Sequence, residues 1–386
     1  MATTIPVPRG LDGVVVADTT VGDVRGHEGF FHYGQYSATD LAAGRSLEDV
    51  WYLLHHGRLP DRQEAAAFAA DVAALRRLPD GLAGLLPAVA AHGQPLDVLR
   101  TAVSLLGPEL GWRPIHDTDR PTLRRQVARL CAVVPTILAA AHRLRHGDDP
   151  VPPRDDLSHA ANYLWMLTGA EPDPVHARAV EQYLILTVDH GFNASTFTAR
   201  VITSTGADLA AAVCGAVGAL SGPLHGGAPS RALDMLDAIG QPDRADPWLR
   251  DAVARGDRLM GFGHRVYKTD DPRALFLRHV AATVGGPLVD FAQDVERTAV
   301  AVLADLKPGR QLYTNVEFYA GVVLNSCGIP RDMFTPTFAC SRTIGWTAHI
   351  LEQAADNRLI RPAARYVGPP PPVPVPVPAP TPAPAA

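Results

Sequence analysis

Cysteine is scarce in this chain, and its four cysteines form no recognisable pattern. They stand far apart, without a C-x-x-C pair, in apolar or helix-like surroundings: Cys131, Cys214, Cys327 and Cys340. A disulfide-rich secreted scaffold, a zinc ribbon and a thioredoxin-type redox motif are therefore excluded. We expect reduced thiols in a cytoplasmic protein.

Lysine is almost absent as well, because only Lys268 and Lys307 occur among the 35 basic residues. The net charge is −5, and the basic residues are spread along the chain without forming a block. Neither nucleic acid nor an anionic membrane surface is therefore expected as a partner.

Long apolar runs are also missing. The longest, such as Cys131–Ala141 and Leu209–Leu220, fall short of the roughly 18 residues that a membrane span needs. The opening MATTIPVPRG has no apolar stretch after a basic start. We therefore expect neither a transmembrane helix nor a signal peptide.

What the chain does have is length and helical periodicity. Its 386 residues are 47% hydrophobic, enough for a large core and two domains. The expected fold is mainly α, with a small hairpin over Leu11–Tyr36, where GVVVADTT and FFHYGQY alternate like short strands. A disordered or polyproline tail is expected over Pro369–Ala386. The expected helices include Leu47–His56, Arg62–Leu75, Thr122–His146, Pro174–His190, Ser195–Leu220, Pro229–Ile239, Pro272–Val284, Leu288–Leu306, Val316–Cys327 and Arg342–Ala354.

Three unusual junctions between loops and helices lie in the second half of the chain. The first is SGPLHGGAPS, Ser221–Ser230, in which glycines flank His225 and a helix begins near Pro229. His225 is either a turn or capping residue, or a neutral hydrogen-bond donor beside a ligand that the glycines admit.

The second junction is MGFGHRVYKTDDPRA, Met260–Ala274. Glycines precede His264, and Asp270 or Asp271 can cap a helix that starts at Pro272. Arg273 then lies in the first turn, where a cation is repelled by the positive end of the macrodipole at a cost of roughly 0.3–1 kcal/mol. It is either exposed or joins the free amides in binding an anion.

The third junction is TNVEFYAG, Thr314–Gly321, followed by the helix that carries Arg342. Asn315 is a good N-cap, and Glu317 in the first turn is favoured by the macrodipole whatever its role. Arg342 sits among apolar and small residues, where a guanidinium needs an anion to be stable.

Together these motifs resemble those of the citrate synthase family. GPLHGG, GFGHRVYK…DPR, NVEFYAG and SRTIGW occur in the family's order with similar separations, and DHGFNASTFTARVI, Asp189–Ile202, is similar too. The resemblance implies a two-domain helical homodimer. The large domain would comprise 1–222 and 327–365, with a small domain at 223–326 inserted between them and a tail at 366–386.

The resemblance also implies roles for individual residues. His225 matches the histidine that hydrogen-bonds the thioester oxygen, His264 the one that polarises the oxaloacetate carbonyl, and Glu317 the base. The other implied contacts are His190, Asn193, Arg273, Arg342 and Arg361 to oxaloacetate, with Arg361 reaching across the dimer, and Lys268 and Arg310 to coenzyme A. The implied reaction condenses acetyl-CoA with oxaloacetate and water to citrate and CoA, with acetyl-CoA as co-substrate and no tightly bound cofactor.

Position 317 departs from the family pattern, because the usual base there is Asp. One extra methylene moves the carboxylate by more than the ~0.5 Å tolerance of a preorganised site. The site is then either built around the longer side chain, as in second citrate synthases of the actinobacterial type, or no longer catalytic.

Two alternatives to citrate synthesis follow. A 2-methylcitrate synthase would use propionyl-CoA, one methylene larger, and a non-catalytic homologue would bind ligands without turnover. A metal site is not expected, because no pair among His225, His264 and Glu317 has the spacing of known ligand sets.

Overall fold

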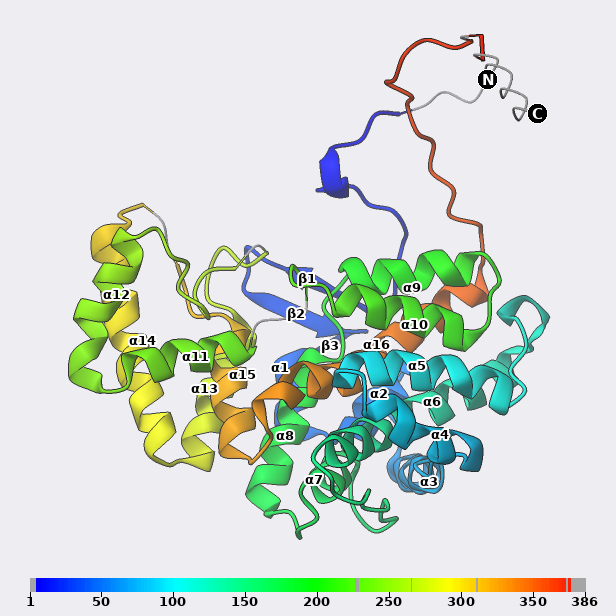
Figure 1. Ribbon diagram of the computed structural model, residues 1–386, viewed down its shortest axis with the longest axis horizontal. Coiled ribbons are helices and arrows are strands. Elements are labelled where there is room, and N and C mark those ends of the chain that lie inside the picture. The colour runs from blue at the N-terminus through cyan, green and yellow to red at the C-terminus, as the bar shows by residue number, and fades with distance from the viewer. Residues whose placement is uncertain (1–4, 226–228, 265, 310–311, 373, 376–386) are drawn as a thin grey trace, which may run out of the picture. The chain divides into compact units, whose positions relative to one another are not determined.

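The computed structural model is mainly helical, as the sequence predicts, and describes residues 5–225, 229–264, 266–309, 312–372 and 374–375 (Figure 1). The first helices are α1 Ala38–Gly44, α2 Leu47–His56, α3 Arg62–Ala74, α4 Asp80–Ala90, α5 Pro95–Glu109, α6 Arg120–Arg145, α7 His159–Thr168 and α8 Pro174–Thr187. They are followed by α9 Ala194–Ser204, α10 Leu209–Leu220, α11 Pro229–Ile239, α12 Ala245–Ala254, α13 Pro272–Val284, α14 Pro287–Leu306, α15 Val316–Ser326 and α16 Phe334–Ala355. Short 3-10 turns are η1 Arg9–Leu11, η2 Ile115–Asp117, η3 Pro242–Arg244 and η4 Arg331–Met333.

The chain separates into two compact units. One is Ala17–Leu359, and the other combines Met1–Val16 with Ile360–Ala386. The first unit holds the helical core and every predicted site residue except Arg361. The predicted division into 1–222, 223–326, 327–365 and 366–386 is a different one and stays a prediction.

A small antiparallel sheet precedes the helices, in the order β1 Gly22–Arg25, β2 Phe30–Tyr33 and β3 Tyr36–Ser37. Phe31 and Tyr33 point into the core, so the alternation expected for FFHYGQY is confirmed. The expected strand over GVVVADTT is wrong, because pairing begins only at Gly22, opposite Tyr33.

The long helix α6 runs through the core of the Ala17–Leu359 unit. Among the described residues it is the one helix long and apolar enough to cross a membrane, yet 72% of its apolar window is buried inside the protein. It packs against α5, α7 and α16. Burial of this kind is typical of the central helix of a helical domain.

Two of the helix boundaries that differ from expectation bear directly on the site. The predicted Pro174–His190 helix ends at Thr187, which places His190 on a loop. The predicted Ser195–Leu220 helix is two helices, because Gly206 adopts φ +82° and Asp208 caps α10 by accepting from the amide of Ala211. Asn193 caps α9 in the same way, through the amide of Thr196.

Helix α16 begins earlier than the predicted Arg342. Its first residue is Phe334, and Pro336 lies in its first turn, where a missing N–H group costs no intrahelical hydrogen bond. Arg342 therefore lies well inside a buried helix. Figure 1 shows α11 to α14 grouped at one side of the unit, with α13 packed on α8 and α15.

Candidate active site

The loop between α8 and α9 carries His190 and is fixed from behind by Asp189. The carboxylate of Asp189 accepts from the amide of Gly191 at 3.0 Å and lies 3.2 Å from Nε2 of His349. Arg200 donates to Nδ1 of His349 at 3.2 Å, so the proton of that ring is on Nε2 and bonds Asp189. The loop is thus held by a buried network.

His190, His264 and Tyr267 lie against one another. Nε2 of His190 is 3.1 Å from the hydroxyl of Tyr267, and the rings of His190 and His264 are 5.9 Å apart in an edge-on arrangement. Burial, reinforced by the charges of Arg273 and Arg342, holds the pKa of His190 well below its usual value. His190 is therefore neutral at pH 7.

Arg273 is a buried cation that is paired with a carboxylate. Its Nε and Nη2 donate to the two carboxylate oxygens of Asp271 at 3.0 and 2.9 Å. Burial favours neutral forms of both groups, but the bidentate pairing outweighs it: the pKa of Asp271 is lowered and that of Arg273 is raised. The predicted capping role of Asp271 is confirmed, since it also accepts from the amide of Arg273.

The hydrogen bonds of His264 define where its proton lies. Its Nδ1 accepts from the backbone N–H groups of Val266 and Tyr267, both at 3.0 Å, so Nδ1 carries no proton. Burial, followed by the charge of Arg273, lowers the pKa of His264 to about 4, so the ring is neutral and its proton is on Nε2. Nε2 lies 3.1 Å from Nη2 of Arg273, so with this tautomer both groups present N–H donors at one place, where a single acceptor oxygen can bind them.

A hydrogen bond and close packing join the start of α15 to the loop that carries His264. Asn315 donates from its side chain to the carbonyl of Gly263 at 2.8 Å and caps the amide of Glu317 at 3.0 Å. Gly261 adopts φ +86°, and a Cβ there would meet Cβ of Phe318 at 2.7 Å. Only glycine lets these segments approach so closely.

Glu317 lies in the first turn of α15, largely buried. Burial raises the pKa of its carboxyl although the charges of Arg273 and Arg258 act in the other direction. The amide of the preceding Val316 donates to Asp271 at 3.1 Å, which ties this helix start to Arg273. A carboxylate with a raised pKa and charged neighbours is a candidate general base.

His225 is attached to a different part of the site. Its Nε2 lies 2.8 Å from Oγ of Ser195, which Trp346 also contacts through an Nε1–H bond of 3.0 Å. Burial, and secondarily Arg342, lower the pKa of His225 to about 4. The ring is neutral and anchored through Nε2, and the described residues give Nδ1 no hydrogen-bond partner.

Arg342 is the second buried cation. It is 2% exposed, stacks over the ring of Phe338 at 4.5 Å, and donates from Nε to the carbonyl of Thr187 at 3.0 Å. Burial lowers its pKa, with Asp189 acting against the shift. The sequence prediction of a guanidinium in apolar surroundings is confirmed.

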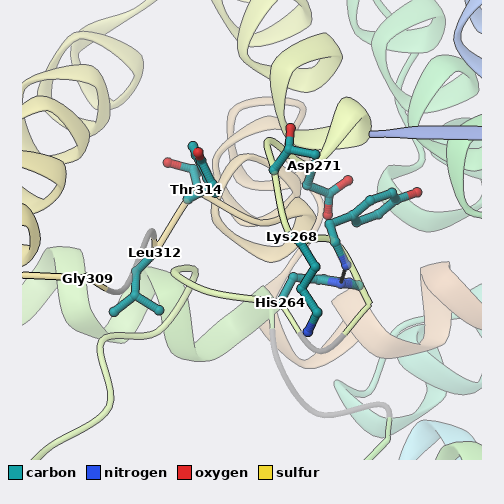
Figure 2. A pocket seen from close by; sticks show the side chains of 9 residues that line it. His264, Lys268, Asp271, Gly309, Leu312 and Thr314 are labelled. Carbon is teal, nitrogen blue, oxygen red and sulfur yellow. Dashed lines mark hydrogen bonds between the residues drawn. The ribbon is translucent and has the colours of Figure 1, made fainter. Parts of the chain in front are cut away.

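A cavity of about 530 Å³ opens beside these groups (Figure 2). Figure 2 shows Lys268 extending next to His264, with Leu312 and Thr314 across the space from them. The predicted coenzyme contact Lys268 thus lines a cavity beside a candidate catalytic histidine. Arg310, the other predicted contact, lies outside the described residues.

Two further predicted contacts have other surroundings. Asn193 caps α9, and its Oδ1 accepts from Oγ of Ser195 at 2.7 Å, one bond removed from His225. Arg361 is exposed and belongs to the unit formed by the terminal stretches. Both substrate contacts stay predictions.

Sequence reasoning missed two residues and one further role that the structure adds. Ser195 anchors His225, Tyr267 contacts His190, and Asp271 neutralises Arg273 as well as capping a helix. Asp271 was detectable, because an acidic residue two positions before a buried arginine can pair with it. The partners of Ser195 and Tyr267 come from distant segments that carry no local signal.

The fold and the site together define a class of protein. Neutral histidines, two buried arginines and one carboxylate of raised pKa characterise an enzyme that transfers protons to or from a small anionic substrate.

Residues 10–363 match the family model described as citrate synthase, C-terminal domain. The citrate synthase of Haloferax volcanii is 43% identical over 366 residues, covering 93% of this chain and 95% of that protein. Citrate synthase 2 of Bacillus subtilis is 39% identical, covering 94% and 96% respectively.

Solved structures agree with these relatives. Citrate synthase from Pyrobaculum aerophilum superposes with a TM-score of 0.87 at 35% identity, covering 97% of this chain and 99% of that one. Citrate synthase from Thermoplasma acidophilum, in a ternary complex with carboxymethyl coenzyme A and oxaloacetate, gives 0.88 at 30% identity with the same coverage. The chain belongs to the citrate synthase family, and it is an acyltransferase.

Proposed function

We propose that this protein condenses acetyl-CoA with oxaloacetate and water to give citrate and free CoA. The observation that carries the proposal is the pair of donors, Nε2 of His264 and Nη2 of Arg273, 3.1 Å apart. A ketone oxygen flanked by a carboxylate, as in oxaloacetate, supplies the acceptors that these donors need.

The chemical steps use the groups in order. Glu317 removes a proton from the methyl group of the thioester, while His225 hydrogen-bonds the thioester oxygen and stabilises the enol. The enol carbon attacks the oxaloacetate ketone, forming the C–C bond of citryl-CoA as His264 donates its proton to the new alkoxide. Water then breaks the C–S bond, releasing citrate and the thiol of CoA.

Substrate binding rests on charge. Arg273, Arg342 and neutral His190 would hold the oxaloacetate dianion, completed in a homodimer by Arg361 of the partner subunit. Acetyl-CoA would enter as co-substrate, with Lys268 near its phosphates. We also propose that the segment 223–326 moves as a small domain over the substrates in a cytoplasmic enzyme.

The test is release of thiol from acetyl-CoA by the full-length protein, with and without oxaloacetate. We expect release that requires oxaloacetate and yields citrate in equal amount. Parallel assays with propionyl-CoA measure acyl preference, since one methylene is worth only about 1–3 kcal/mol. Tight oxaloacetate binding without thiol release from either thioester would instead identify a non-catalytic homologue.

A further inference from the structure

Two histidines and an aspartate that the catalytic site does not use meet at the end of α6. His142 and His146 are one turn apart, with ring centroids 4.3 Å from each other. Asp332, in η4, places Oδ2 3.8 Å from Nδ1 of His142. One potential ligand atom from each residue lies within 4.8 Å of the other two.

The hydrogen bond of His146 leaves one ring nitrogen ready to bind a cation. Its Nδ1 lies 2.8 Å from the backbone carbonyl of His142, and a carbonyl can only accept, so Nδ1 carries the proton. When the ring carries this proton alone, the lone pair of Nε2 is available to a cation. Metal-binding histidines typically donate their other N–H to a carbonyl or carboxylate in this way.

His142 supplies an independent observation. Its side chain is only 12% exposed, and Nδ1 is a buried atom without a hydrogen-bond partner among the described residues. A buried polar atom without a partner is costly, so such atoms commonly bind an ion or water. The Asp332 carboxylate, at 3.8 Å, is too distant for a hydrogen bond but close to the ligand separation around a shared ion, which is roughly 3.3 Å for metal–ligand bonds near 2.1 Å.

The dipole of α6 favours a cation at this place. These residues lie at the C-terminal end of α6, where the macrodipole is negative. Of the neighbouring arginines, Arg331 pairs with acidic residues of α11. Arg145 donates to the carbonyl of Gly93 and the side chain of Gln94, and its positive charge still acts on Asp332.

We propose that His142, His146 and Asp332 bind one divalent transition-metal ion of the Zn²⁺ type. Imidazole nitrogens favour such ions, whereas Mg²⁺ and Ca²⁺ prefer sites built from oxygen. His146 and Asp332 are exposed, so water can complete the coordination. None of the three lines the cavity beside His264, so the site lies outside the proposed catalytic machinery.

The ion would act as a clamp. It would join the end of α6 to η4, which leads directly into α16, the helix that carries Arg342. Arg331, beside Asp332, already pairs with Asp234 and Asp237 of α11. A metal here would therefore tie together three segments of the fold and raise resistance to heat.

The experiment titrates ZnCl₂ into the full-length, chelator-treated protein without a histidine tag, by isothermal calorimetry. We expect saturation at one ion per chain and no response to MgCl₂. His146→Ala and Asp332→Asn should each weaken Zn²⁺ binding roughly tenfold or more, since even outer-shell changes cost 10- to 100-fold. His279→Ala, an exposed histidine on α13, is the matched control and should bind Zn²⁺ like the native chain.

A Co²⁺ titration adds a readout that reports the ligands themselves. Visible absorption from Co²⁺ bound to histidine should appear in the native protein and in His279→Ala, but not in His146→Ala. Circular dichroism establishes that each variant is folded, and Asp332→Asn serves if His146→Ala is not. Absence of saturable Zn²⁺ binding, or equal affinity in native protein, His146→Ala and Asp332→Asn, would overturn the proposal.

Discussion

Replacing Glu317 by Gln removes a proton acceptor while keeping the size of the side chain. No described side chain hydrogen-bonds the Glu317 carboxylate, and burial raises its pKa. The ionised group is thus held at some cost to the folded state, and an uncharged amide relieves that cost. We expect Glu317→Gln to fold at least as stably as the native protein and to bind oxaloacetate normally.

The expected loss lies in the proton-transfer step. A positioned general base typically contributes 10²- to 10⁴-fold to a rate, which corresponds to about 2.7–5.4 kcal/mol of activation free energy. The turnover number for thiol release should fall by that factor. The Michaelis constant for oxaloacetate should change little, because Arg273, Arg342 and His264 are untouched.

The assay compares three proteins under saturating acetyl-CoA: native, Glu317→Gln and Glu171→Gln. Glu171 is exposed, so the same chemical change there controls for the amide substitution itself. Oxaloacetate affinity is measured separately by calorimetry. A Glu317→Gln protein that turns over within about threefold of the native rate would refute the assignment of the base, whatever the enzyme makes.

Four further predictions concern the pH profile of Glu317 and the remaining groups. The pKa of Glu317 is raised above its ordinary 4.5, and the base must be ionised, so kcat/KM should fall as the pH drops through that raised pKa. Glu317→Gln should lack this acid limb. His225 and His264, with pKa values of about 4, stay neutral in this range. Arg342→Leu should weaken oxaloacetate binding by roughly 1.5–3 kcal/mol in calorimetry, the worth of a charged hydrogen bond. Arg273→Leu should in addition lower the free energy of unfolding, measured in urea, by roughly 3–5 kcal/mol, because it leaves the buried Asp271 carboxylate without its cation. Equal stability of Arg273→Leu and Arg342→Leu would contradict this. Ser195→Ala should lower kcat more than it raises KM for oxaloacetate, since it frees His225, and an unchanged kcat would count against Ser195 as a positioning residue.

Helices with local start signals could be predicted from the sequence, and those defined by distant contacts could not. Helix α13 begins at Pro272, as predicted, and its cap is Asp271, one of the two caps that the sequence offers there. The break between α9 and α10 was missed because both flanks are apolar and helical in period. There, Gly206 leaves the helix to meet His116, whose amide donates to its carbonyl at 3.3 Å.

The candidate site divides in the same way. His264 and Arg273 stand nine positions apart, and their contact follows from a loop and a helix start that the sequence indicates. The bond from Ser195 to His225 joins the start of α9 to the Ser221–Ser230 junction, and only the packed helices bring these two segments together. The spacing of His142 and His146 can be seen in the sequence. Asp332 comes from far along the chain, and nothing in the sequence indicates that it lies beside these two histidines.

The two buried arginines are not equivalent, and the difference bears on catalysis. Arg273 is neutralised by Asp271 through two hydrogen bonds, whereas the Nε bond of Arg342 goes to a backbone carbonyl. Burial accordingly lowers the pKa of Arg342, while pairing raises that of Arg273. An incoming anion therefore gains most at Arg342, the cation without a bidentate partner. Because His190, His225 and His264 stay neutral, they add little to the attraction of the anionic substrate in the ground state. Their hydrogen bonds strengthen as negative charge develops on the reacting oxygens. Interactions that are stronger in the transition state than in the ground state lower the barrier, whereas equal ones only bind the substrate.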